Sequence, residues 1–339
     1  MASDFAFTHK HYVPIIKTKA GERWALSHLT TRSQLTPLLE LHAHKRKGVA
    51  THAGDICKDL ASAWGTDGPV FLDTIWLNGS TGNPRVIADV FAAARNHGLQ
   101  AIPVVRVSYD APTLAQIRAV IDEDDREVML RLTQSDLAST SAIRRTLDAL
   151  KAAHHDVHLL VDYQRSPMNL ASDVPRVPNL HDWRTFTAAS GAFPRSLITL
   201  PQGIWHSLPR TDWTSWEPAV AAGQLARRPT FGDYTIRDPG APADFGDPIV
   251  NVRYTSDTHW TVRVGGKHRA GASIQMKQIC QDLIARPEYS GQQYSAGDAE
   301  LHSTAQPRTP PGGPTQWLQW CVSHHLVFVV DQIQQHPSL

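Results

Sequence analysis

The feature that most constrains the fold is a regular alternation of short apolar, β-branched segments with longer amphipathic segments. Strand-length segments occur at residues 12–19, 35–42, 70–77, 101–110, 127–133, 157–164, 195–204 and 228–237. Segments with helical periodicity separate them, at residues 20–32, 51–64, 84–98, 111–124, 140–155, 181–191 and 213–226. Strands that alternate with helices form a parallel sheet, because each helix carries the chain back to the edge where the next strand begins.

Eight such units within about 240 residues predict a closed (β/α)8 barrel of the TIM type. The alternative is an open, doubly wound sheet, which usually has fewer strands and often a glycine-rich phosphate-binding loop. Neither GxGxxG nor GxxxxGKS/T occurs in the chain. The sequence therefore favours the barrel.

The alternation stops after the eighth strand. Residues 248–266 contain two β segments around a polar turn, which predicts a hairpin insertion. Residues 272–285 have the periodicity of a helix that closes the barrel. The C-terminal extension, 286–339, is expected to add a loop and then a helix followed by a strand. We expect a single barrel domain over residues 1–339.

Composition excludes several classes of protein. Apolar residues make up 41% of the chain and charged residues 19%, which is typical of a globular protein with a substantial core. The formal net charge is +1, so no general attraction to nucleic acid or anionic lipid is indicated. Direct nucleic-acid binding and membrane association are therefore disfavoured.

The cysteines and the N-terminal segment indicate a cytoplasmic protein. Cys57, Cys280 and Cys321 are widely spaced and form no CxxC pair, so we expect buried thiols in a reducing compartment. The first residues lack the features of a signal peptide, and no apolar run has transmembrane length.

A polar or charged residue lies near the end of each predicted strand. In chain order these are Lys17, Glu40, Asp73, Arg106, Arg131, Asp162, Gln202 and Asp233. Side chains alternate between the faces of a strand, so these positions can point inward two residues after an apolar one. In a barrel they would form a ring at the carboxyl ends of the strands, where active sites of this fold are found.

The residue types in the ring suggest roles. Asp162, Asp233 and Glu40 are the candidate catalytic residues, as general acids or bases. The candidate ligand-binding residues within the ring are Lys17, Asp73, Arg106, Arg131 and Gln202. Arginine binds phosphate or carboxylate through two parallel hydrogen bonds, so the ring predicts a polar anionic ligand such as a nucleotide or a sugar phosphate.

Other interpretations of the same residues remain open. The ring charges can neutralise one another in a purely structural ion-pair network, although burying charges is rarely a net source of stability. Paired carboxylates also occur in glycosidases. The histidine pair at 42 and 44 and Lys17 suggest zinc or pyridoxal phosphate only weakly, because the accompanying residues of those barrels are missing. No metal site is assigned, and the cofactor is unknown.

Two further groups lie beyond the barrel strands. Tyr254, Trp260 and Arg263 belong to the predicted hairpin, which we expect to cover the mouth of the barrel and contribute to ligand binding. His324 and His325 are adjacent, so on a helix they would differ by about 100°. We expect one to be packed and the other exposed.

Several segments of the chain resemble the "beta protein" family of phages and bacteria. They are YVPIIKTKAGERWAL, LTPLLEL, FGDYTIR, NVRYTSDTHWTVRVGG, YSAGDAEL and SHHLVFVV. The resemblance covers nearly the whole chain and highlights Lys17, Glu40, Asp233, Tyr254, Trp260, Arg263, Asp298, His324 and His325. It implies no established reaction. Because some members lie among mobile or defence genes, it implies a role in phage–host conflict.

The sequence thus predicts a barrel that binds, or binds and hydrolyses, a polar anionic small molecule at its mouth. If it is an enzyme, we expect a hydrolase that acts on a phosphate-bearing or glycosidic substrate. The competing hypothesis is a non-catalytic recognition or scaffold protein, with a protein partner in a phage or antiviral defence complex.

Overall fold

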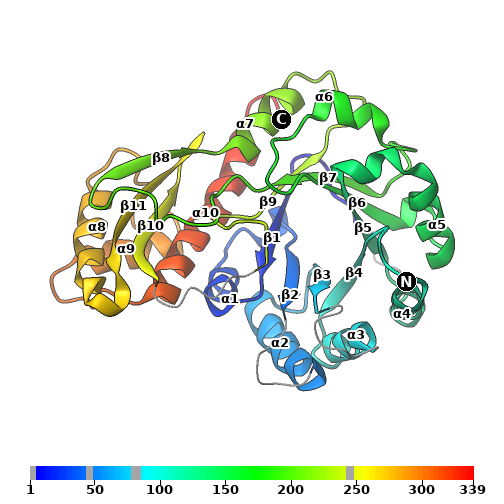
Figure 1. Ribbon diagram of the computed structural model, residues 1–339, viewed down its shortest axis with the longest axis horizontal. Coiled ribbons are helices and arrows are strands. Elements are labelled where there is room, and N and C mark those ends of the chain that lie inside the picture. The colour runs from blue at the N-terminus through cyan, green and yellow to red at the C-terminus, as the bar shows by residue number, and fades with distance from the viewer. Residues whose placement is uncertain (1–4, 43–48, 78–84, 242–247) are drawn as a thin grey trace.

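The computed structural model describes residues 5–42, 49–77, 85–241 and 248–339. Its centre is a closed barrel of parallel strands (Figure 1). In order around the barrel they are β1 (Tyr12–Lys17), β2 (Leu38–His42), β3 (Pro69–Trp76), β4 (Gln100–Val105), β5 (Val128–Thr133), β6 (Val157–Asp162), β7 (Thr185–Ser190) and β9 (Thr230–Asp233). The predicted (β/α)8 barrel is confirmed.

Helices follow the strands and form the outer layer. They are α1 (Ala20–Ser27), α2 (Val49–Trp64), α3 (Val86–Asn96), α4 (Ala111–Asp124), α5 (Thr140–Leu150), α6 (Leu170–Asp173) and α7 (Thr211–Ala221). The sequence of α5 shows why they lie flat on the barrel. Ile143, Leu147 and Leu150 are buried at helical spacing, whereas Arg144 and Arg145 face solvent.

The register of the strands determines which side chains meet at the carboxyl end. Lys17 pairs with Glu40 across β1 and β2, and Glu40 pairs with Asp73 across β2 and β3. These residues therefore lie at one level of the barrel. Below them, apolar side chains fill the interior, including Ile15 and Phe71.

The seventh strand differs from the prediction. We expected a helix at 181–191 and a strand at 195–204, but β7 covers Thr185–Ser190 and residues 195–204 contain no strand. Apart from Phe186, the segment TFTAAS has only short side chains. Its short side chains gave no apolar run to detect.

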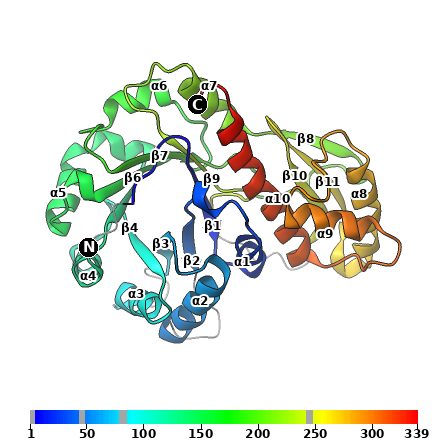
Figure 2. The same ribbon diagram turned by 180° about the vertical axis from the view of Figure 1, so that it is seen from behind.

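The second part of the molecule is an antiparallel sheet beside the barrel (Figures 1 and 2). Its strands, in order, are β10 (Ile249–Thr255), β11 (His259–Lys267) and β8 (Trp205–Pro209). The predicted hairpin, 248–266, is thus confirmed as β10 and β11. It is joined by β8, a strand that leaves the barrel between β7 and α7.

The C-terminal elements are all helical within the described residues. They are α8 (Gln275–Ile284), α9 (Ala296–Ala305) and α10 (Pro314–Gln335). The expected C-terminal strand is therefore wrong, because its apolar residues continue α10. The predicted closing helix at 272–285 corresponds to α8, which packs on β10, β11 and α9 rather than on the barrel.

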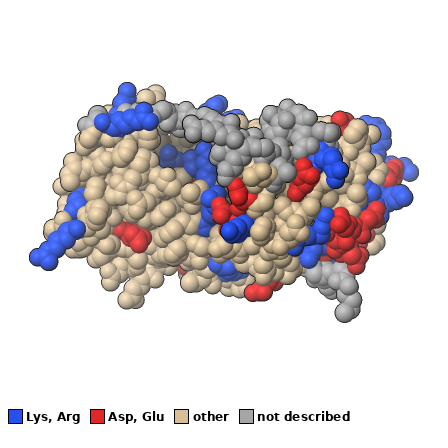
Figure 3. Space-filling view, turned by 90° about the horizontal axis from the view of Figure 1, so that it is seen from below, with Lys and Arg blue, Asp and Glu red and all other residues tan. Residues whose placement is uncertain are grey.

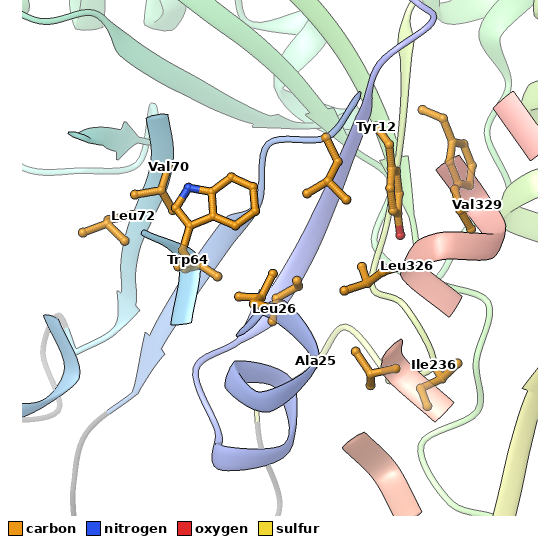
Figure 4. Close-up of a cluster of buried hydrophobic side chains, with 14 of the residues drawn as sticks. Tyr12, Ala25, Leu26, Trp64, Val70, Leu72, Ile236, Leu326 and Val329 are labelled. Atoms are coloured by element: carbon orange, nitrogen blue, oxygen red, sulfur yellow. The ribbon is translucent and has the colours of Figure 1, made fainter. Parts of the chain in front are cut away.

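Helix α10 takes the place of the eighth barrel helix. It packs against β1 and α1 on one side, and against β10 and α9 on the other. Figure 4 shows the ring of Tyr12, from β1, beside Leu326 and Val329 of α10. Because α10 is buried on both sides, nearly its whole length carries apolar residues.

Candidate functional site

Five of the eight predicted ring residues lie inside the carboxyl mouth of the barrel. Lys17, Glu40, Asp73, Arg131 and Asp162 are all at most 5% exposed. Together with Arg106 and Tyr234, which contact them, they form what we call the mouth cluster. The strand-end positions thus bring together groups from seven strands or the loops that follow them.

Arg131 is the centre of the mouth cluster. Its Nη1 donates to Glu40 (3.0 Å) and Asp73 (2.7 Å). Its Nε and Nη2 both donate to Oδ2 of Asp162, at 3.1 and 2.7 Å. Nη2 also donates to the hydroxyl of Tyr234 at 2.5 Å. Each nitrogen of the guanidinium therefore has a partner, and each contact to a carboxylate is charge-assisted.

Local turns hold two of the carboxylates in place. Asp73 Oδ1 accepts from the backbone N–H of Ile75 (2.9 Å), and Asp162 Oδ1 accepts from that of Gln164 (2.9 Å). An aspartate that binds the N–H two residues later stabilises the turn where a strand ends. One carboxylate oxygen thus fixes the backbone, and the other faces Arg131.

Burial and neighbouring charges separate the acidities of Glu40 and Asp73. Burial raises the pKa of Glu40, although Arg131 acts in the opposite direction. Burial also disfavours the charge of Asp73, but Arg106 and Arg131 outweigh it and lower the pKa of that carboxyl. Two facing carboxyls with pKa values moved apart resemble an acid–base pair, with Glu40 as the acid.

Arg106 lies at the edge of the cluster and has unused hydrogen-bonding capacity. Its Nη2 donates to Asp73 Oδ2 (3.0 Å), and its side chain is 11% exposed. Its Nε is buried and has no hydrogen-bond partner in the part of the chain that the structure describes. A buried donor without a partner is rare in folded proteins and calls for an explanation.

Lys17 faces the loop that follows β9. Its Nζ donates to the carbonyl oxygens of Asp238, at 2.7 Å, and Gly240. Burial lowers its pKa to about 8, while the charge of Glu40 acts in the opposite direction. Lys17 therefore anchors the loop at the side of the mouth.

Asp233 does not belong to the mouth cluster, which corrects the sequence prediction. Its Oδ1 accepts from the hydroxyl of Tyr12 (2.6 Å), and its Oδ2 lies 2.9 Å from Nε2 of His325 on α10. Its side chain therefore points outward from β9. The inward positions of this strand are Gly232 and Tyr234, because strand side chains alternate.

Asp233 is instead part of a buried group between the barrel and the second sheet. We call it the junction cluster, which consists of Tyr12, Asp233, Tyr254, Thr255, Asp298, His324 and His325. All of these side chains are fully buried.

The two histidines of α10 connect the halves of the junction cluster. His325 Nδ1 lies 2.8 Å from the hydroxyl of Thr255, opposite its contact with Asp233. His324 Nδ1 lies 2.9 Å from Asp298 Oδ2, and its Nε2 lies 2.9 Å from the carbonyl oxygen of Thr255. The expectation that one histidine would be exposed is wrong, because α10 is covered on both faces.

The sequence model of a family described as Beta protein matches residues 12–331. The chain belongs to the beta protein family. The resemblance found in the sequence is thereby confirmed. No curated protein matches the chain significantly.

Solved structures with a similar fold share little sequence with this beta protein. One is a dihydrodipicolinate synthase family protein from Coccidioides immitis, with 10% identity and a TM-score of 0.33 over 68% of each chain. Another is a mutant tryptophan synthase alpha-subunit from Pyrococcus furiosus, with 14% identity and a TM-score of 0.34 over 56% of this chain and 81% of that one. A third is triosephosphate isomerase from Bartonella henselae, with 9% identity and a TM-score of 0.28 over 66% and 91%.

The remaining predicted ligand-binding residues of this beta protein lie away from the mouth cluster. Gln202 is exposed in the loop before β8, because the seventh strand is elsewhere. Tyr254 donates to Asp298 Oδ1 (2.7 Å) within the junction cluster. Trp260 is buried against Phe193, in the second part of the molecule.

Arg263 also belongs to the second part of the beta protein. It forms an ion pair with Asp282 of α8 and lies over the ring of Trp205, 5.6 Å from its centre. The hairpin is thus held by α8 and α10 and does not bring Tyr254, Trp260 or Arg263 to the mouth cluster.

Two members of the site were not predicted. Tyr234 donates to Asp162 Oδ2 (2.7 Å), and Trp76 Nε1 donates to Glu40 Oε2 (3.0 Å). In the sequence, Gly232 was the available indication that Tyr234 points inward, because residues 232 and 234 lie on the same face of the chain. A Cβ at this glycine would lie 2.9 Å from both Ala189 Cβ and the carbonyl oxygen of Val13, so residue 232 must face the crowded interior.

The described residues of this beta protein contain neither a cluster of metal ligands nor a helix that could span a membrane. Within them, no group of three or more His, Cys, Asp or Glu side chains is placed to hold a metal ion. Among residues 5–42, 49–77, 85–241 and 248–339, every helix is too short or too polar to pass through a bilayer. All three cysteines are free and buried, as expected.

Proposed function

We propose that the protein binds a polar anionic small molecule at the carboxyl mouth of the barrel, and that Arg106 is the main residue that binds it. The observation that supports this most is the buried Nε of Arg106, which has no hydrogen-bond partner among the described residues. An oxyanion accepts two parallel hydrogen bonds from a guanidinium and would satisfy this donor. The position also agrees with the fold, because ligands of barrels bind at this end.

Charge balance links anion binding to protonation. With Asp233 outside, the mouth cluster has three acidic side chains, Glu40, Asp73 and Asp162, facing Lys17, Arg106 and Arg131. These charges balance when all are ionised, so an incoming anion adds uncompensated negative charge. Glu40 has the raised pKa and is therefore the group expected to take up a proton.

The same carboxyl pair supports hydrolysis as the reaction class. Glu40, when protonated, can donate to the leaving oxygen of a phosphate ester or glycoside, while Asp73 stays ionised beside Arg106 and Arg131. Asp162 has a positioning role in this proposal. Its Oδ2 already accepts from Arg131 and Tyr234, and its Oδ1 accepts from a backbone N–H.

A second candidate function is recognition without catalysis, through a protein partner in a phage or antiviral defence complex. The observation that favours it is the complete internal pairing of Arg131. An ion-pair network that is satisfied internally can close a barrel without binding any ligand.

The two functions are separated by a ligand screen with matched variants. Nucleotides and sugar phosphates are tested for an increase in the melting temperature, since a ligand that binds only the folded state stabilises it. Arg106→Gln is expected to abolish the increase. Glu40→Gln is expected to keep binding and lose any turnover.

Arg144→Gln is the control for this screen, because Arg144 is an exposed arginine on α5. It is expected to behave like the wild type in every assay. A screen without any stabilising compound, together with capture of a protein partner that surface substitutions disrupt, would support the recognition function instead.

A further inference from the structure

A cavity lies outside the barrel, where the barrel meets the antiparallel sheet. Its volume is about 340 Å³. The start of α1, strand β10 and the start of α10 line it, and Figures 1 and 2 show these elements side by side. Its charged or amide-bearing lining residues are Lys19, Glu22, Arg237, Asn251 and Arg253. No residue of the mouth cluster lines this cavity.

Arg253 lies in this cavity without a carboxylate partner among the described residues. Its Nε donates to Asn251 Oδ1 (2.8 Å), and its Nη1 donates to the carbonyl oxygen of Ile236 (3.0 Å). The guanidinium lies over the ring of Phe193, 4.9 Å from its centre. Burial and the neighbouring charge of Arg237 lower its pKa to about 10. Such a cation is stabilised when an anion binds beside it.

Two helices begin at the same cavity. A Cβ on Gly21, in the first turn of α1, would lie 3.1 Å from the carbonyl oxygen of Thr315, in the first turn of α10. The starts of both helices are therefore in close contact. Each carries a partial positive charge from the backbone N–H groups of its first turn, which in α10 follow Pro314, and this charge favours phosphate and other anions. In Figure 3, Lys and Arg side chains lie near the centre of the face together with Asp and Glu side chains, beside the mostly uncharged surface on the left.

Glu22 supplies a hydrogen-bond acceptor to the same cavity. Its Oε1 accepts from Arg237 Nε (3.0 Å) and Nη2 (2.9 Å). Its Oε2 is buried and has no hydrogen-bond partner within residues 5–42, 49–77, 85–241 and 248–339, and the residue is only 1% exposed. A buried carboxylate oxygen of this kind needs a donor, such as a hydroxyl group on a ligand.

We propose that this cavity binds a hydroxylated phosphate monoester. The phosphate binds Arg253 and the starts of α1 and α10, and a hydroxyl group donates to Glu22 Oε2. Trp317, Leu318 and Pro248 provide apolar walls for the carbon skeleton. This site is separate from the anion site at Arg106 and does not depend on it.

The test uses inorganic phosphate and glycerol 2-phosphate as probes, titrated calorimetrically into the full chain. Both are expected to bind, and glycerol 2-phosphate more tightly because it has hydroxyl groups for Glu22. Arg253→Gln is expected to weaken both about tenfold or more, since it removes a charged hydrogen-bond donor. Arg106→Gln is expected to leave this binding unchanged, so failure here is distinguishable from failure of the mouth site.

A second pair of variants decides the question if Arg253→Gln does not fold. Thr315 is exposed in the first turn of α10, where an acidic residue is compatible with the helix. Thr315→Glu places a carboxylate beside the cavity and is expected to abolish phosphate binding without lowering the melting temperature. Thr315→Gln is the uncharged control and is expected to bind.

The proposal is overturned if the wild type binds neither probe. It is also overturned if Arg253→Gln or Thr315→Glu, when folded, binds both probes as tightly as the wild type.

Discussion

The mouth cluster and the junction cluster are both buried groups of polar and ionisable side chains, but they differ in how completely their hydrogen-bonding atoms are paired. In the junction cluster, both ring nitrogens of each histidine and both oxygens of each aspartate have partners. In the mouth cluster, Arg131 is equally satisfied, yet no described residue bonds the buried Nε of Arg106. The comparison indicates that the junction cluster holds the two parts of the molecule together, whereas the mouth cluster also has capacity for a ligand.

The most severe test of the mouth cluster is Arg131→Met. It leaves three buried carboxylates without their shared cation, and removing one partner of a buried ion pair costs about 3–5 kcal/mol. We expect a loss of at least this size in the free energy of unfolding, measured by urea denaturation. A variant as stable as the wild type would show that the cluster is not ionised as described.

The corresponding change in the junction cluster is His325→Leu. It removes a partner of the fully buried Asp233 and the contact with Thr255, and we expect a loss of about 2–4 kcal/mol. Ligand binding at Arg106 should be retained in the folded fraction. If this variant kept full stability but lost binding, the roles assigned to the two clusters would have to be exchanged.

Asp212 makes the stability of the region around the junction cluster depend on pH. It lies beside the junction cluster, and burial raises its pKa to about 7 from an ordinary value of 3.8, although Arg210 acts in the opposite direction. The unfolded chain therefore ionises this carboxyl more readily, and the wild type loses stability as the pH rises from about 4 to 7.

Asp212→Asn removes this ionisation. The stability of the variant relative to the wild type should therefore improve over the same pH range, by about 1–3 kcal/mol. Thermal unfolding at several pH values measures the difference. A constant difference between pH 4 and 8 would contradict a raised pKa.

The smallest expected effect on stability is that of Arg106→Gln. Asp73 keeps its bonds to Arg131 and to the backbone of Ile75, so we expect a cost of only about 1 kcal/mol. The same variant should lose ligand binding. Large destabilisation without any ligand effect would assign Arg106 to the structural network.

The sequence predicted the parts of the molecule that depend on local pattern. Seven barrel strands were identified because their apolar, β-branched residues are consecutive. Strand β7 was missed because Thr185–Ser190 has one large apolar residue, Phe186. The burial of its other, short side chains depends on neighbouring strands rather than on their own hydrophobicity.

Most of the candidate site was predicted from the alternation of side chains along single strands. The prediction failed where the position of a side chain depends on neighbouring strands. Lys17, Glu40, Asp73, Arg131 and Asp162 were placed correctly, because two-residue alternation carries each to the interior. For Asp233 the phase of the strand was wrong by one residue, and such a shift moves every side chain to the other face. The cavity at Arg253 could not be predicted, because its lining comes from α1, β10 and α10, which are far apart in the sequence.

The central claim is that the mouth cluster binds an anion at Arg106 and that Glu40 takes up a proton when it does. Calorimetric titration with a ligand from the screen, in two buffers with different ionisation enthalpies, measures this proton directly. We predict net proton uptake, tighter binding as the pH falls, and loss of both effects in Glu40→Gln. The account would be contradicted by an observed binding enthalpy that is the same in both buffers. It would also be contradicted by binding that persists unchanged in Arg106→Gln.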